Sequence, residues 1–160
     1  MIIENVIGNM KNRDADSFKK DYVEIHWYES RKKINRLLSK NGAEIGIKLD
    51  DHTADHGLQE GDILFLNENT KELIYVSILP EKCIVVEGAN TKMMAKLAYE
   101  IGNRHAPLFY GSHEFQLVVP FDEPMQELLK KYSSSIEVAE IKLLESNAIS
   151  SVSNKGDHHH

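Results

Sequence analysis

One segment decides how the second half of the chain folds: Asn90-Thr-Lys-Met-Met-Ala-Lys-Leu-Ala-Tyr-Glu-Ile-Gly-Asn-Arg-His105. Asn90 or Thr91 can cap the start of a helix, and Gly102-Asn103 is expected to end it in a left-handed turn. Between them, apolar side chains recur at helical spacing and predict one buried face, made of Met93, Met94, Leu97, Ala98 and Ile101. The pattern therefore places His105 at a fixed point on the edge of a packed element.

Strand patterns surround this helix and predict the fold of the C-terminal domain. A second helix is expected after Asp122, which can serve as its N-cap, with Pro124 in the first turn. The expected strands are 82–86, 107–110, 114–119 and 136–141. The order strand, helix, strand, strand, helix, strand (βαββαβ) is that of an α+β ferredoxin-like domain.

The first half of the chain is typical of an all-β domain. Its clearest signal is Asn41-Gly42, which predicts a type I′ hairpin turn with both residues at positive φ, followed by a buried alternation through Ile45, Ile47 and Leu49. A Gly61-Asp62 turn precedes another strand, and Pro80 breaks the last one. We therefore expect a β-rich partner-binding domain at 1–79, a ferredoxin-like domain at 80–143 and a flexible tail at 144–160.

The tail is polar and rich in serine, a composition that predicts disorder. It ends in Asp157 and three histidines, His158, His159 and His160. An affinity tag is usually longer than three histidines, so a native tail is favoured, although the sequence leaves both origins open.

Composition and charge limit the partners. The 160 residues are 41% hydrophobic with a net charge of -6, so no basic surface is expected for nucleic acid or an anionic membrane. Cys83 is the only cysteine, which excludes a disulfide framework and a CxxC metal site; we expect it to be buried. The N-terminus lacks the features of a signal peptide, and no apolar run reaches membrane-spanning length, so a cytoplasmic location is predicted.

Four further histidines are assigned to the surface. His26 is expected on the polar face of a strand and His113 in an exposed hairpin turn. His52 and His56 are spaced i, i+4, which on a helix could chelate a metal, but the acids, Thr53 and Gly57 around them favour a loop. In a loop this spacing fixes no geometry, so no metal is predicted there.

The run Tyr99-Glu-Ile-Gly-Asn-Arg-His105 resembles the signature of the urease accessory protein E (UreE) family, dimeric metallochaperones that carry nickel to urease. Domain order, the Gly61-Asp62 turn and the histidine-bearing tail extend the resemblance over nearly the whole chain. It implies a homodimer formed through the C-terminal domain, with His105 of each protomer near the two-fold axis. The tail histidines, His158, His159 and His160, would complete the shell around Ni²⁺, with Zn²⁺ as a competitor.

The same resemblance implies partners: the GTPase accessory protein UreG, and the urease apoprotein with its other accessory proteins. The sequence contains no nucleophile elbow, Walker loop or HExxH motif, so the protein is predicted not to be an enzyme. Two alternatives remain: a protein-interaction module, and a general zinc or nickel storage protein, with His105 structural. A metal-responsive regulator would need a basic DNA-reading surface that the charge balance lacks.

Overall fold

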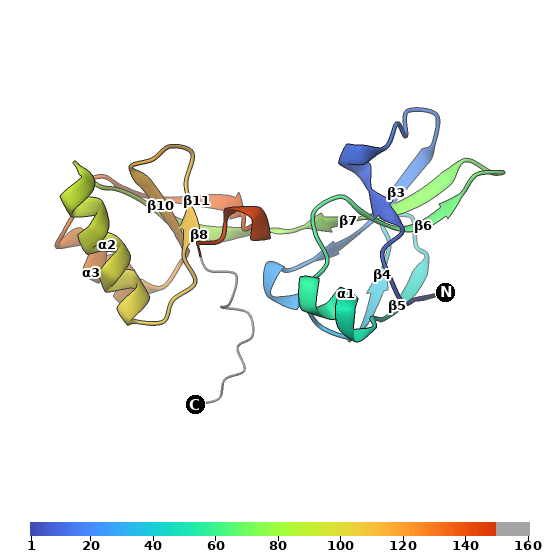
Figure 1. Cartoon of the computed structure of the whole chain (residues 1–160), viewed down its shortest axis with the longest axis horizontal. Coiled ribbons are helices and arrows are strands. Elements are labelled where there is room, and N and C mark those ends of the chain that lie inside the picture. The colour runs from blue at the N-terminus through green and yellow to red at the C-terminus, as the bar shows by residue number, and fades with distance from the viewer. Residues whose placement is uncertain (150–160) are drawn as a thin grey trace. The chain divides into compact units, whose positions relative to one another are not determined.

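The computed structural model describes residues 1–149 and divides the chain into two compact units, Met1–Leu79 and Pro80–His160. Figure 1 shows strands dominating the first unit and two helices beside a sheet in the second. Both predicted fold classes are confirmed. Among the described residues, no helix combines the length and apolar character needed to cross a membrane.

The N-terminal unit consists of two sheets. One has the order β1-β5-β4 and the other β2-β6-β7-β3, with parallel pairing only between β1 and β5 and between β3 and β7. The strands are β1 (Ile2–Ile3), β2 (Gly8–Asn9), β3 (Lys19–Ile25), β4 (Ile34–Leu38), β5 (Glu44–Lys48), β6 (Asp62–Asn67) and β7 (Glu72–Ile78). Short 3-10 helices lie at Met10–Asn12 and Trp27–Glu29.

The hairpin of β4 and β5 forms as predicted, but its turn is not type I′. Gly42 has a φ of 95°, whereas among the described residues other than glycine only Lys71 and His105 have positive φ, so Asn41 does not. Ser39 and Ala43 close the loop, with Ser39 N donating to Ala43 O at 2.8 Å and Gly42 N donating to Ser39 O at 3.0 Å. This longer loop needs only one left-handed residue, and glycine supplies it.

A helix, α1 (Asp51–His56), stands where the sequence predicted a loop. The Asp50 carboxylate caps it by accepting a hydrogen bond from Thr53 N at 2.7 Å, and this bond holds the pKa of Asp50 below its usual value. Ala54 is buried under the helix, and Gly57, at a φ of 78°, ends it. Capping and burial together outweigh the low helix propensity of the acids.

The C-terminal unit has the sheet order β11-β8-β10-β9, in which every neighbouring pair is antiparallel. In chain order its elements are β8 (Pro80–Glu87), α2 (Thr91–Asn103), β9 (Phe109–Tyr110), β10 (Gln116–Pro120), α3 (Glu123–Lys130) and β11 (Ile136–Lys142). With the first strand between the last and the third, this is the ferredoxin-like arrangement.

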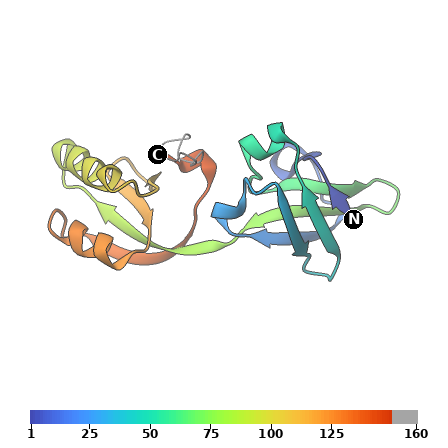
Figure 2. The ribbon, with the colours of Figure 1, turned by 90° about the horizontal axis from the view of Figure 1, so that it is seen from below.

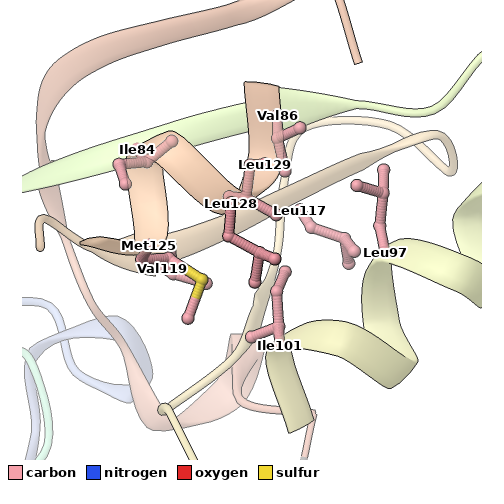
Figure 3. Close-up of a cluster of buried hydrophobic side chains, with 9 residues drawn as sticks. All are labelled: Ile84, Val86, Leu97, Ile101, Leu117, Val119, Met125, Leu128 and Leu129. Carbon is pink, nitrogen blue, oxygen red and sulfur yellow. The ribbon is translucent and has the colours of Figure 1, made fainter. Parts of the chain in front are cut away.

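One apolar core joins the two helices to the sheet. Figure 3 shows its side chains converging from two strands and both helices: Ile84, Val86, Leu97, Ile101, Leu117, Val119, Met125, Leu128 and Leu129. Met93, Met94 and Ala98 pack against it, so the predicted buried face of α2 is confirmed. Both predicted N-caps also form, because Asn90 accepts a hydrogen bond from Met93 N and Asp122 one from Met125 N.

The residues just after β11 belong to this unit. Leu143 is buried, a 3-10 helix spans Glu145–Asn147, and Ile149 N donates to Leu108 O at 2.9 Å. The sequence placed 144–149 in the flexible tail because the segment is mostly polar. Ile149, however, packs against the apolar core and holds the segment on the domain.

Cys83 provides a test of the packing. Its side chain is fully buried, as predicted, and burial raises the pKa of the thiol to about 11. Because the thiolate is the reactive form, we expect Cys83 to resist iodoacetamide at neutral pH in the folded protein and to react fully in denaturant. Mass spectrometry of the alkylated protein measures both, and rapid labelling without denaturant would contradict the buried position of β8.

Candidate metal centre

The end of α2 holds His105. Ile101, fully buried, fixes the last turn of the helix against the core, and the following Ala106 and Leu108 pack on the same core. The residue is thus held on both sides by apolar contacts of residues one to four positions away. This anchoring leaves the backbone of residue 105 little freedom.

The helix ends differently from the prediction. Gly102 and Asn103 remain helical, and the left-handed residue is His105 itself, at a φ of 58°. Arg104 N donates to Ile101 O at 3.1 Å and His105 N to Gly102 O at 2.9 Å, so the helix ends two to three residues later than expected. The position usually taken by glycine or asparagine is occupied by histidine.

A left-handed backbone costs a residue with a Cβ atom roughly 1–2 kcal/mol. Such outliers cluster at functional sites, where the surrounding structure enforces them. At His105 no contact of the ring compensates for this conformational cost. The imidazole is exposed and has no hydrogen bond or ion pair within residues 1–149. Its two nitrogens are accessible to a ligand.

Few other ligands surround His105 in one chain. Glu100 pairs with Lys96, at 3.4 Å between carboxylate and ammonium. Across the described part of the chain, no three His, Cys, Asp or Glu side chains gather closely enough to hold a metal. The predicted ligands His158, His159 and His160 lie outside the described residues.

The tail nevertheless starts close to His105. Ile149, the last described residue, bonds to Leu108, only three positions after the histidine. Three residues span at most about 11 Å and the nine from Ile149 to His158 at most about 32 Å, so chain length allows the tail histidines to reach His105. Sequence reasoning missed this anchor, and the only signal for it was an isolated apolar Ile149 in a polar segment.

Two of the other histidines have local partners. His26 lies just after β3 and not on it; its ring is half-buried and stacks on Tyr28, with centroids 5.0 Å apart. His113 is exposed and pairs through Nε2 with Glu87 at 3.2 Å, while its Nδ1 accepts a hydrogen bond from Phe115 N. Both contacts serve the local fold.

The remaining pair, His52 and His56, is brought together by α1. Both side chains are exposed, and their ring centroids are 4.4 Å apart. The predicted loop would have left them unrelated. The signal that could have found the helix was Asp50 as N-cap combined with an alanine, Ala54, four residues later.

Comparison with known proteins identifies the family. Residues 3–78 match the model of the UreE urease accessory protein N-terminal domain, and residues 81–160 match that of its C-terminal domain. The chain is 43% identical to the urease accessory protein UreE of Helicobacter pylori (strain Shi470), over 89% of this chain and 82% of that protein. It is 44% identical to UreE of Helicobacter hepaticus, over 86% and 77%, and 42% identical to UreE of Helicobacter acinonychis, over 89% and 82%.

The left-handed backbone at residue 105 can be tested through stability. Because glycine has no Cβ, we expect His105→Gly to exceed His105→Ala in the free energy of unfolding by about 1 kcal/mol. Urea denaturation followed by helical circular dichroism measures the difference, since α2 and α3 supply most of the helix. An alanine variant as stable as the glycine variant would show that residue 105 is not left-handed in solution.

Proposed function

Because the chain belongs to the UreE family of urease accessory proteins, we propose that it binds Ni²⁺ through His105 and delivers it for assembly of the urease active site. An accessory role in urease maturation follows from the family itself. So does the confirmed prediction that the protein is not an enzyme. The observation that carries the nickel proposal is the exposed imidazole on an anchored, left-handed residue, an imidazole that has no hydrogen bond or ion pair within residues 1–149.

A single imidazole is too few ligands for tight binding, so the proposal includes a homodimer formed through the C-terminal unit. A two-fold axis close to His105 brings two copies of this residue to one metal. One shared ion per dimer is then the expected stoichiometry. The exposed aromatic side chain of Tyr99 on α2 (66% exposed) is consistent with an interface on this helix.

The tail histidines would add ligands to this pair. The hydrogen bond between Ile149 and Leu108 supports this role, because it attaches the start of the tail to the unit that contains His105, three residues from that histidine. A short tether gives a ligand an effective concentration in the millimolar range. His158, His159 and His160 would then retain the ion, while the paired His105 residues fix its position.

Imidazole ligands suit a carrier. They bind Ni²⁺, Zn²⁺ and Cu²⁺ without the closed thiolate cage that would hinder release, so Zn²⁺ is the expected competitor. The proposed recipient machinery is the GTPase accessory protein UreG and the urease apoprotein with its other accessory proteins, in the cytoplasm. The β-rich N-terminal unit would dock on this complex.

The contributions of His105 and of the tail to nickel affinity can be measured by isothermal titration with nickel, and the stoichiometry by native mass spectrometry. Loss of even a group that supports a metal ligand costs about 10- to 100-fold in affinity, so His105→Ala is expected to weaken tight binding by at least about 100-fold. Deletion of residues 157–160 should weaken it by a smaller factor and leave one tight ion per dimer.

His113→Ala is the matched control, since His113 is an exposed histidine of the same unit that pairs with Glu87. It should bind nickel like the parent. Neither His105→Ala nor the deletion should dissociate the dimer. If the deletion abolishes tight binding and His105→Ala does not, the tail is the site and His105 has a structural role.

A further inference from the structure

We propose that the N-terminal unit carries a second divalent-metal site, separate from His105, in which the imidazoles of His52 and His56 on α1 chelate one cation. The proposal goes beyond the nickel-carrier function and does not depend on it. Its basis is the helix that replaced the predicted loop: residues spaced i, i+4 lie on one helix face, one turn apart.

The two rings have a spacing close to that of a chelate. Their centroids are 4.4 Å apart and their planes are inclined by 54°. A cation about 2.1 Å from one nitrogen of each ring would hold the ring centres about 4.6 to 5.3 Å apart, for angles of about 90° to 109° at the metal. The rings are therefore close enough for side-chain rotation to bring one nitrogen of each onto a single cation.

The protonation of His56 is set by its backbone contact. Its Nδ1 lies 3.0 Å from the carbonyl oxygen of His52, and because a carbonyl can only accept, Nδ1 carries the proton and donates. The lone pair is then on Nε2. This is the usual arrangement of a metal-binding histidine, whose second nitrogen donates to a carbonyl or carboxylate. Within the described residues, the His52 ring has no hydrogen bond, and it lies against the His56 ring.

The helix is fastened at both ends, which makes the pair rigid for so short an element. Its residue Ala54 is buried against the rest of the unit, and Lys33 pairs with Asp51 near the start of the helix. At its end, Gln59 Nε2 donates to His56 O at 3.0 Å and to Gly57 O at 3.2 Å. In Figures 1 and 2, α1 lies at the outside of its unit, where both imidazoles can meet dissolved ions.

The surrounding charge is compatible with a cation. The segment carries three carboxylates, Asp50, Asp51 and Asp55. Two basic groups from another segment contact it: Lys33 pairs with Asp51, and Arg31 donates to Asp55 O. Asp50 is occupied as the helix cap and Asp51 by Lys33. The Asp55 carboxylate is exposed, but within the described residues no three His, Cys, Asp or Glu side chains gather closely enough to hold a metal, so the imidazole pair is the proposed ligand set. Ligands of this class select Ni²⁺, Zn²⁺, Cu²⁺ or Co²⁺ over Mg²⁺ and Ca²⁺.

Two protein ligands leave the other coordination positions to water. Such an open site is expected to bind more weakly than one shared by two His105 residues and the tails, and to exchange its ion readily. The N-terminal unit would thus hold an exchangeable cation of the same chemical class that the C-terminal unit is proposed to carry.

The test is a titration of the full-length, nitrogen-15-labelled chain with Ni²⁺ in the His105→Ala background, so that nickel at residue 105 contributes nothing. Paramagnetic Ni²⁺ should broaden the amide signals of Asp51–His56 before those of the rest of the N-terminal unit. Adding His52→Ala or His56→Ala should weaken this effect about tenfold or more, because a chelate is reduced to one ligand. Alanine favours helix, so both variants should keep α1.

Two further variants complete the design. His26→Ala, which removes the other histidine of this unit, should leave the broadening unchanged. Asp55→Asn should change it little if imidazoles hold the ion. Broadening that survives both His52→Ala and His56→Ala, or that is absent from α1 at millimolar nickel, would overturn the proposal. Neither result would bear on His105, whose contribution has been removed.

Discussion

The packing of α2 through Leu97 and Ile101 against β8 and β10 is the constraint on which the candidate metal centre depends. Burying each of these side chains stabilises the fold by about 1.5–3 kcal/mol. The left-handed backbone at His105 costs roughly 1–2 kcal/mol. The packing term is larger, so the helix keeps its register and the strain is tolerated at its end. A helix held less firmly would end at a position that relieved the strain, and residue 105 would no longer be fixed.

The same core also sets the surroundings of His105. Leu108 and Ile149 both contact it, and the hydrogen bond between their backbones brings the start of the tail beside the histidine. In the proposed function, this hydrogen bond would let the tethered imidazoles of the tail join the exposed imidazole of His105 without a preformed cage. This arrangement matches the requirements of a carrier, which needs one fixed ligand to define the site and others that a recipient can displace. Cys83, the one thiol, is buried with its pKa raised by desolvation, which makes it a poor candidate for a metal ligand.

Sequence patterns predicted the features that depend on neighbouring residues and on the periodic spacing of apolar side chains. The apolar spacing of α2, the caps Asn90 and Asp122, the β-rich first half and the βαββαβ order all appear in the structure. The features that were missed depend on contacts between distant residues. Helix α1 needs Arg31 and Lys33 from another segment as well as the burial of Ala54. The left-handed backbone was assigned to Gly102-Asn103 on propensity, whereas the core contacts of Ile101 and Ala106 moved it to His105.

Both candidate sites place exposed imidazoles at positions fixed by a buried helical residue, Ile101 in α2 and Ala54 in α1. The buried residue provides the rigidity, and exposure keeps the ligand exchangeable. Burying the imidazoles would have added desolvation costs and slowed release of the cation. Placing them on unanchored loops would have left their positions relative to one another undefined. For the proposed nickel carrier, ligand type alone cannot give specificity, since raw affinity favours Cu²⁺ over Ni²⁺. Selectivity must therefore come from the geometry that these buried anchors impose, which is why the packing of α2 bears on metal choice as well as on stability.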